Sequence, residues 1–187
     1  EKWNYNNTGY FLLGMIIENL AEKSYAEFLN ERIFQPLGMS DTRVNDLKPI
    51  VKSRASGYSW NGTTLVNGEH ASMTWPFAAG AIVSTVADMA KWDAALYSEK
   101  VLPRSSLEQM WTPTKLADGK MKNYGFGWGV DMVNGQKLIG HGGGISGFST
   151  DIARFVDDKL TVITLANLEG ASPAPIGRGV AAIYIPE

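Results

Sequence analysis

The sequence contains no cysteine among its 187 residues. Disulfide bonds and thiolate metal sites are therefore excluded, although the compartment is left open. Excess charge of one sign is also missing, because 17 lysine and arginine residues stand against 19 aspartate and glutamate residues, a formal net charge of −2. Without a basic patch, we expect no binding to nucleic acid. No apolar run reaches the roughly 20 residues that a membrane-spanning helix needs, and no signal-like charged and apolar stretch opens the sequence.

Histidine is almost as scarce, with only His70 and His141 present. Their wide separation does not match the spacing of histidine metal ligands, so we predict no metal site. No motif implies a cofactor, and we expect His70 to lie in a loop. His141, by contrast, stands directly before three glycines in the segment LIGHGGGISGF, residues 138–148.

Apolar periodicity predicts helices in the first part of the chain. Residues 9–23 have helical spacing, and a second helix runs through Ile33 before Pro36 ends it. Two more helices are expected, one over about 85–97 and one after 105. The residues expected to begin these four helices are Asn7 or Thr8, Ser24 with Glu27, Thr85 with Asp88, and Ser105 with Glu108.

The last third of the chain has the turn residues and alternation of β-strands. Asn134-Gly135 is a strong two-residue hairpin signal between strands at 125–133 and 136–141. Asp157-Asp158 separates the next two strands. Earlier hairpin candidates are Asn61-Gly62 and Asn67-Gly68. Residues 175–187 fit either a helix or a strand.

Helices followed by an antiparallel meander predict an α+β fold. We expect one domain over residues 1–187. Within it, residues 1–115 form a mainly helical and loop part, 124–167 the antiparallel sheet, and 168–187 a C-terminal segment.

The glycines after His141 could serve several purposes. A phosphate-binding loop is excluded, because no Gly-Lys-Ser/Thr and no helix follow. The oxyanion loop of α/β-hydrolases needs a later G-x-S-x-G, and the nearest match, GISGF at 144–148, ends in phenylalanine. A third possibility is a strand whose bare backbone lies against a substrate and offers an N–H to an oxyanion. A bulged strand packed closely against a helix, without any function, explains these residues equally well.

Five sequence blocks bear on this choice. In chain order they are WNYNNTGYFLLGMIIE, FQPLGMSDT, AAGAIVSTVADMAKW, YGFGW and GHGGGISGF. Together they resemble the serine β-lactamase-like family, which includes class C β-lactamases, penicillin-binding DD-peptidases and related esterases. The resemblance covers about residues 3–167. It implies a partial β-lactamase/transpeptidase-like fold and a location in the periplasm or outside the cell.

The resemblance gives Tyr5-Asn6-Asn7 the place of the family's Tyr-x-Asn motif. Tyr5 would then be the general base and acid, and Asn7 would position the substrate. Two simpler interpretations stay open at this point. Tyr5 could be an aromatic residue packed under the start of a helix, and Asn7 could be the cap of that helix.

The resemblance also gives His141-Gly142-Gly143 the place of the Lys-Thr-Gly strand motif, in its histidine-bearing form. His141 and Gly143 would line the substrate-binding strand together with Gly142. Gly144 would donate one N–H to the oxyanion. The predicted site therefore consists of Tyr5, Asn7, His141, Gly142, Gly143 and Gly144.

The sequence departs from the family in one respect. The family's nucleophile is the serine of Ser-x-x-Lys, and no serine here has lysine three residues later. The nearest pattern, residues 112–115, is a threonine version in the wrong order along the chain. We therefore expect the middle and C-terminal part of such a protein. It should be inactive alone, because a tyrosine base needs nearby cations such as that lysine.

These observations predict a serine hydrolase that attacks amide or ester carbonyls through an acyl-enzyme, with its nucleophile absent from this chain. The expected substrate is a small acyl compound: a β-lactam, a D-Ala peptide or an ester. The alternative is a non-catalytic domain whose groove binds a peptide or cell-wall fragment. The apolar strand at 160–167 predicts self-association or pairing with a missing N-terminal segment. Residues 179–185 could instead fold back along it as a strand.

Overall fold

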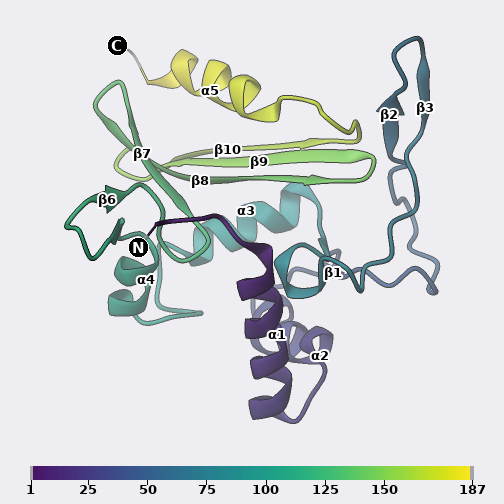
Figure 1. Ribbon diagram of the computed structural model, residues 1–187, viewed down its shortest axis with the longest axis horizontal. Coiled ribbons are helices and arrows are strands. Elements are labelled where there is room, and N and C mark those ends of the chain that lie inside the picture. The colour runs from purple at the N-terminus through teal and green to yellow at the C-terminus, as the bar shows by residue number, and fades with distance from the viewer. Residues whose placement is uncertain (1, 186–187) are drawn as a thin grey trace.

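The computed structural model describes residues 2–185 and has the predicted α+β fold. Figure 1 shows a twisted antiparallel sheet with α5 along one face, α3 across the other, and α1 and α2 paired at a distance from it. The helices are α1 (Asn7–Ala21), α2 (Tyr25–Leu29), α3 (Val86–Ala95), α4 (Arg104–Met110) and α5 (Pro173–Tyr184), with a π-helical turn at Asn30–Phe34 and a 3-10 turn at Phe77–Ala79. None of the helices in residues 2–185 has the length and apolar content that crossing a bilayer requires.

The main sheet has the order β10-β9-β8-β7. Its strands are β7 (Gly129–Val133), β8 (Gln136–Ile145), β9 (Phe148–Phe155) and β10 (Leu160–Ala166). Three two-stranded pairs accompany it, namely β1 (Arg43–Val44) with β4 (Ile82–Val83), β2 (Tyr58–Trp60) with β3 (Leu65–Asn67), and β5 (Thr114–Lys115) with β6 (Met121–Lys122).

Alternate residues of β8 bury opposite faces of this sheet, as the two-residue period of a strand requires. Ile139 packs with Leu96 and Leu107 in a core on the α3 side. Leu138 packs with Phe155 and with Ala181 of α5 in a second core. The sheet is thus buried on both faces, and β8 runs through its interior.

The predicted hairpins have mixed outcomes. The turn at Asn134-Gly135 is confirmed, with both residues at positive φ between β7 and β8, although β7 begins at Gly129 rather than at 125. The strands around Asp157-Asp158 are also confirmed as β9 and β10. Asn61-Gly62 does not form a two-residue turn, because the Asn61 side chain accepts from the Thr63 and Thr64 amides and closes a four-residue turn. Asn67-Gly68 is not a hairpin turn, since Asn67 belongs to β3.

Two predicted helix starts are confirmed and two are wrong. Ser24 with Glu27 forms a full capping box, and Thr85 accepts from the Asp88 amide. The chain's first helix is capped by Asn6 and not by Asn7 or Thr8. The fourth begins at Arg104, and its predicted box fails because Glu108 pairs with Arg104 at 3.0 Å instead of reaching back to Ser105.

Residues 173–184 form helix α5, so the alternative in which residues 179–185 add a strand to β10 is wrong. Residues 186–187 of the C-terminal segment lie outside the described residues. Pro173, Gly177 and Ala181 recur at four-residue spacing and are buried against β9 and β10. Helical periodicity therefore decides the conformation of the segment.

The buried Arg154 of β9 ties α3 to the sheet. Its side chain is 0% exposed, and its Nε donates to the carboxylate of Asp93 in α3. Thr161 of β10 donates to the same carboxylate oxygen at 2.9 Å. The guanidinium also lies 4.9–5.8 Å from the ring centres of Tyr97, Trp111 and Trp128. Charge pairing and cation–π contacts thus offset part of the cost of burying the cation, whose Nη1 and Nη2 atoms have no hydrogen-bond partner among the described residues.

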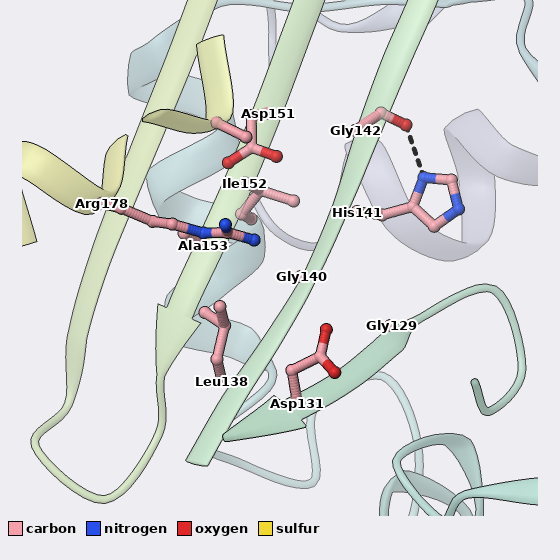
Figure 2. A pocket seen from close by; sticks show the side chains of 11 residues that line it. Gly129, Asp131, Leu138, Gly140, His141, Gly142, Asp151, Ile152, Ala153 and Arg178 are labelled. Atoms are coloured by element: carbon pink, nitrogen blue, oxygen red, sulfur yellow. Dashed lines mark hydrogen bonds between the residues drawn. The ribbon is translucent and has the colours of Figure 1, made fainter. Parts of the chain in front are cut away.

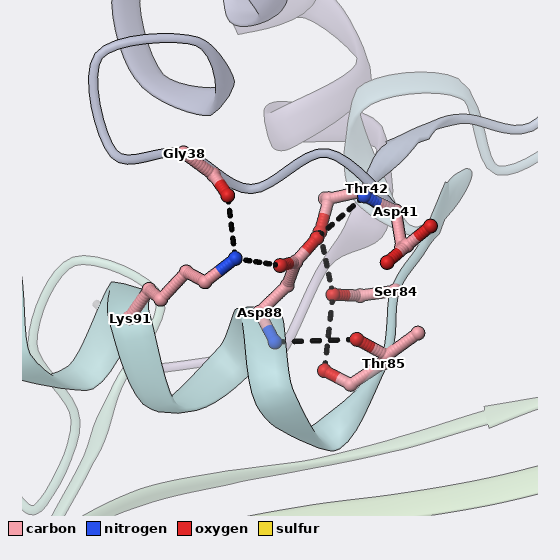
Figure 3. Close-up of polar contacts among 7 residues, drawn as sticks. All are labelled: Gly38, Asp41, Thr42, Ser84, Thr85, Asp88 and Lys91. Atoms are coloured by element: carbon pink, nitrogen blue, oxygen red, sulfur yellow. Dashed lines mark hydrogen bonds and ion pairs between the residues drawn. The ribbon is translucent and has the colours of Figure 1, made fainter.

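A second buried carboxylate fixes the other end of α3 (Figure 3). Asp88 is 1% exposed and accepts hydrogen bonds from the Asp41 amide at 2.8 Å and the Thr42 hydroxyl at 2.9 Å. Its other oxygen accepts from Lys91 Nζ at 2.8 Å, and Lys91 also donates to the Gly38 carbonyl. Two of the five sequence blocks, around PLGMSDT and STVADMAKW, are therefore joined by one carboxylate.

We predict that Asp88→Asn lowers the free energy of unfolding at pH 7 by about 2–3 kcal/mol, because three donors lose a charged acceptor. Burial alone would raise the pKa of Asp88 above its ordinary 3.8, but the hydrogen bonds from Lys91, Thr42 and Asp41 outweigh burial and lower it. The charged form therefore stabilises the fold above pH 3.8, and this contribution is lost as pH falls through the lowered pKa. Urea unfolding at a series of pH values measures both effects.

The matched control is Asp118→Asn. Asp118 pairs with Lys120 at 2.8 Å, but both side chains are exposed, so this substitution should change stability little. Equal losses in the free energy of unfolding for the two variants would contradict the stabilising role of the Asp88 carboxylate. So would a difference in stability between Asp88→Asn and the unsubstituted chain that stays the same in acid.

Candidate active site

The candidate site is built on strand β8, whose two neighbours differ in length. β9 pairs with β8 over residues 138–145, whereas β7 pairs with it only over residues 136–140. The last β7 pair is Gly129 with Gly140, where the two strands separate in Figure 2. Among the described residues, no strand covers that side of β8 from His141 to Ile145. We call this side of residues 141–145 the open edge.

The alternation of an antiparallel ladder decides which backbone groups face the open edge. Val133 and Gln136 close the β7–β8 hairpin, and Ile145 and Phe148 close the β8–β9 hairpin, each over a two-residue turn. Residues at even positions of β8 therefore direct N–H and C=O toward the β7 side, and residues at odd positions direct them toward β9. The N–H and C=O groups of Gly142 and Gly144 thus face the open edge.

Lack of room for a side chain explains some of the glycines of β8 but not all of them. A Cβ on Gly140 would lie 2.6 Å from the Ile152 carbonyl oxygen, and one on Gly143 would lie 2.7 Å from Thr150 Oγ1. A Cβ on Gly142 would make only ordinary contacts, and one on Gly144 would meet nothing within 4 Å. Close packing therefore accounts for Gly140 and Gly143. Gly142 and Gly144 are exposed, and packing does not explain why these two positions lack a side chain.

The N-terminus of α1 brings Tyr5 and Asn7 to this edge. Because Asn6 caps the helix by accepting from the Gly9 amide at 2.9 Å, the Asn7 side chain is not used as a cap. Asn7 Oδ1 instead accepts a hydrogen bond from Tyr5 Oη at 3.0 Å. The Tyr5 side chain is 47% exposed, so it is not an aromatic residue buried beneath the helix.

The structure brings Tyr5 and His141 together from distant parts of the chain. Their ring centres lie 6.1 Å apart with an interplanar angle of 32°. The predicted residues Tyr5, Asn7 and His141 therefore lie beside one another at the start of the open edge, with Gly142, Gly143 and Gly144 following along β8.

Tyr124 also belongs to this group, although no role was predicted for it. Its hydroxyl lies 2.9 Å from Nε2 of His141, and its ring packs against Trp3 and Tyr5 at 5.5 and 6.0 Å between centres. Burial, with smaller contributions from Tyr10 and Tyr5, raises the pKa of Tyr124 to about 12. The hydroxyl therefore keeps its proton at neutral pH. Its only sequence signal is its position at the head of the YGFGW block.

A small pocket lies on the α5 side of β8 (Figure 2). Its volume is about 140 Å³, and its lining includes Asp131, Asp151 and Arg178 over the glycines of β7 and β8. Burial raises the pKa of Asp151, while Arg178 and His141 act to lower it. His141 and Gly142 also line this pocket, but Figure 2 shows the His141 ring on the other side of β8 from Asp151 and Arg178. A larger hollow of about 440 Å³ on the β2–β3 hairpin contains none of the predicted site residues.

Within residues 2–185, no group of three or more histidine, aspartate or glutamate side chains is arranged to hold a metal ion. The polar groups at the open edge are a phenol pair, an imidazole, an amide and backbone N–H and C=O groups. Such a set can transfer protons and stabilise an oxyanion.

Comparisons with known proteins identify similar sequences and structures. The sequence profile of the family described as Beta-lactamase matches residues 1–184. A penicillin-binding protein of Bacillus subtilis is 32% identical over 183 residues, which cover 90% of this chain and 40% of that protein. A D-aminopeptidase of Brucella ovis is 29% identical over 193 residues, covering 98% of this chain and 35% of that protein.

Solved structures give the same result. An octameric penicillin-binding protein homologue from Pyrococcus abyssi superposes with a TM-score of 0.84 and 30% identity, covering 98% of this chain and 43% of that one. A D-amino acid amidase from Ochrobactrum anthropi superposes with a TM-score of 0.79 and 27% identity, covering 98% and 58%. The chain thus spans less than half the length of the curated relatives named above and about half the length of these two structures.

The glycines of β8 supply a matched test of the site's backbone. We predict that Gly140→Ala lowers the free energy of unfolding by about 1–3 kcal/mol, because its Cβ overlaps a backbone carbonyl that cannot move alone. Gly144→Ala should change it by less than about 1 kcal/mol, since the new methyl group meets open space. Thermal and urea unfolding of both variants measure this. Similar losses at both positions would show that the open edge is not open.

Proposed function

Because the chain belongs to the beta-lactamase family, we propose that it supplies the general base and the substrate-binding strand of a serine hydrolase that acts through an acyl-enzyme. The observation that carries this proposal is the placement of Tyr5 beside His141 at the start of an exposed glycine edge. The sequence contains no Ser-x-x-Lys, so the nucleophile is not among these 187 residues.

In this proposal Tyr5 acts as the base in its phenolate form: the phenolate oxygen takes the proton of the attacking serine, and the resulting phenol returns that proton to the leaving group. In the ligand-free structure the phenol is protonated and donates to Asn7 Oδ1 at 3.0 Å. That proton must leave before Tyr5 can act as the base. Asn7 orients the phenol through this hydrogen bond, and its amide N–H₂ can contact the acyl chain of the substrate.

The open edge of β8 would bind the substrate's own amide groups as an added strand. Gly144 N–H is the proposed oxyanion donor, because it faces the open edge. A backbone N–H held in a strand needs no reorganisation when charge develops on the carbonyl oxygen. His141 and Gly143 line the same strand, and Gly142 leaves room for the substrate backbone to approach.

The substrate class we propose is a D-aminoacyl amide or a related small acyl compound. The support is the naming of two relatives as a D-aminopeptidase and a D-amino acid amidase, together with a penicillin-binding protein. By the same resemblance, we infer a location in the periplasm or outside the cell.

We also infer that β10 pairs with another polypeptide, either a second copy or a further segment of the whole protein. Among the described residues, β10 pairs only with β9 and stands at the edge of the main sheet. Its sequence from 160 to 166 is apolar and β-branched, with no charge and no proline, which favours strand addition. The homologue from Pyrococcus abyssi is described as octameric.

We predict that the 187-residue chain alone gives no turnover and no covalent adduct with a chromogenic cephalosporin or a p-nitrophenyl ester, because the activated serine is absent. Intact-mass spectrometry after long incubation checks this, with the full-length penicillin-binding relative from Bacillus subtilis as the positive control. Stoichiometric acylation of any serine would refute the assignment of the nucleophile to a segment outside this sequence.

We further predict that the chain binds D-alaninamide at the open edge, seen as a shift of the Gly144 amide resonance, and binds the L-enantiomer more weakly. Gly144→Pro should weaken binding about tenfold, because it removes one hydrogen-bond donor. An edge position tolerates proline, since that N–H has no ladder partner.

The matched control is Gly144→Ala, which keeps the N–H and should bind normally. Equal weakening by both substitutions would point to a steric effect and not to the donor. Binding with resonance shifts confined to the β2–β3 hairpin would favour a non-catalytic binding domain and contradict the proposed groove.

A further inference from the structure

Both ring nitrogens of His141 have partners in the structure. Nδ1 lies within hydrogen-bonding distance of the carbonyl oxygen of Gly142, the contact drawn in Figure 2. Nε2 lies 2.9 Å from the hydroxyl of Tyr124. A carbonyl oxygen can only accept, so Nδ1 must donate. A neutral imidazole carries one N–H, so Nε2 must accept, and Tyr124 is the donor.

Tyr124 is suited to this donor role by its chemistry and its anchoring. With its pKa raised to about 12, the phenol does not lose its proton at neutral pH. Its backbone carbonyl accepts from the Thr114 amide at 3.0 Å and from the Thr114 hydroxyl at 2.7 Å. Its own amide donates to the Lys122 carbonyl at 2.7 Å. These bonds hold the backbone from which the ring extends to His141.

Tyr124 also stands at the point where β8 loses its second neighbour. It forms an isolated antiparallel bridge with Gly129, the first residue of β7. Gly129 in turn pairs with Gly140, the residue before His141. The phenol that contacts His141 therefore comes from the chain that borders the beginning of the open edge.

We propose that Tyr124 is a positioning residue whose hydroxyl donates to Nε2 and, together with the Gly142 carbonyl at Nδ1, fixes His141 in the Nδ1–H tautomer. The imidazole then holds the Gly142 carbonyl and leaves Gly144 as the free pairing position of the open edge. Gly142 and Gly144 both face this edge. The imidazole occupies one lone pair of the Gly142 carbonyl, whereas among the described residues the N–H and C=O of Gly144 have no hydrogen-bond partner. Tyr124 would thus set the register in which a substrate pairs with β8.

The tautomer can be read directly from the ligand-free chain by ¹⁵N NMR of the neutral imidazole. Only His70 and His141 contribute signals, and His70 serves as the internal reference. We expect a pyrrole-type resonance at Nδ1 and a pyridine-type resonance at Nε2 of His141. Tyr124→Phe, which keeps the ring and removes the hydroxyl, should convert this single form into a mixture of the two tautomers.

The matched control is Tyr5→Phe. It removes a hydroxyl from the other tyrosine beside His141, but that hydroxyl donates to Asn7, so the tautomer should not change. A pyridine-type Nδ1 in the unsubstituted chain overturns the proposal by itself, even if Tyr124→Phe fails to fold. Retention of the single Nδ1–H form in folded Tyr124→Phe also overturns it.

The register interpretation rests on the proposed function, whereas the tautomer does not. Failure of D-alaninamide to bind, with the expected tautomer present, would refute the proposed substrate and leave the Tyr124–His141 contact intact. Binding of D-alaninamide without the expected tautomer would refute the role of Tyr124 and leave the hydrolase assignment intact.

Discussion

The unequal lengths of β7 and β8 are the constraint on which the candidate site depends. β8 has ten residues and β7 five, so the inner strand of the sheet becomes an edge from His141 onward. An unpaired strand edge has free N–H and C=O groups and is ready to pair with another chain. Here the exposed stretch is short and rich in glycine, with an imidazole and two phenols at its beginning. It therefore has the form of a binding edge for a small extended ligand.

The groups that serve this edge come from parts of the chain that fold for their own reasons. Capping by Asn6 satisfies the first turn of α1, and this leaves the Asn7 amide to orient Tyr5. Tyr124 is anchored by Thr114 and by the bridge to Gly129. No single segment contains the site. Its geometry depends on α1, the β6–β7 connection and β8 being held in place together.

Two buried charges provide much of that support. Asp88 fixes the N-terminal end of α3 to the loop at 38–42, and Asp93 near its other end receives Arg154 from β9 and Thr161 from β10. Helix α3 therefore links the α1–α2 region to the sheet through polar bonds as well as apolar packing. Removing one partner of a buried charge leaves the other uncompensated, so these contacts are costly to lose. Tyr5 precedes α1 and His141 lies in the sheet, so α3 connects the two parts of the fold that carry them.

The sequence by itself determined the fold class, two of the helix caps and the hairpin at Asn134-Gly135, because caps and two-residue turns depend on a few neighbouring residues. Its resemblance to a family also indicated that Tyr5, Asn7 and His141 belong to one site. Local pattern failed where side chains had competing partners. Asn6 took the cap expected of Asn7 or Thr8, and Glu108 paired with Arg104 instead of closing a box at Ser105.

Only the tertiary structure decided which glycines of β8 are free of packing and which face the open edge. A glycine run looks the same in sequence whether a neighbouring strand covers it or not. Tyr124 was missed for the same reason, since its contact with His141 arises from the bridge between Tyr124 and Gly129 and the pairing of Gly129 with Gly140. Residues 175–187 fitted a helix or a strand until the faces of β9 and β10 were known. Burial of Gly177 and Ala181 against those faces made residues 175–184 helical, because pairing and packing are set between segments and not within one.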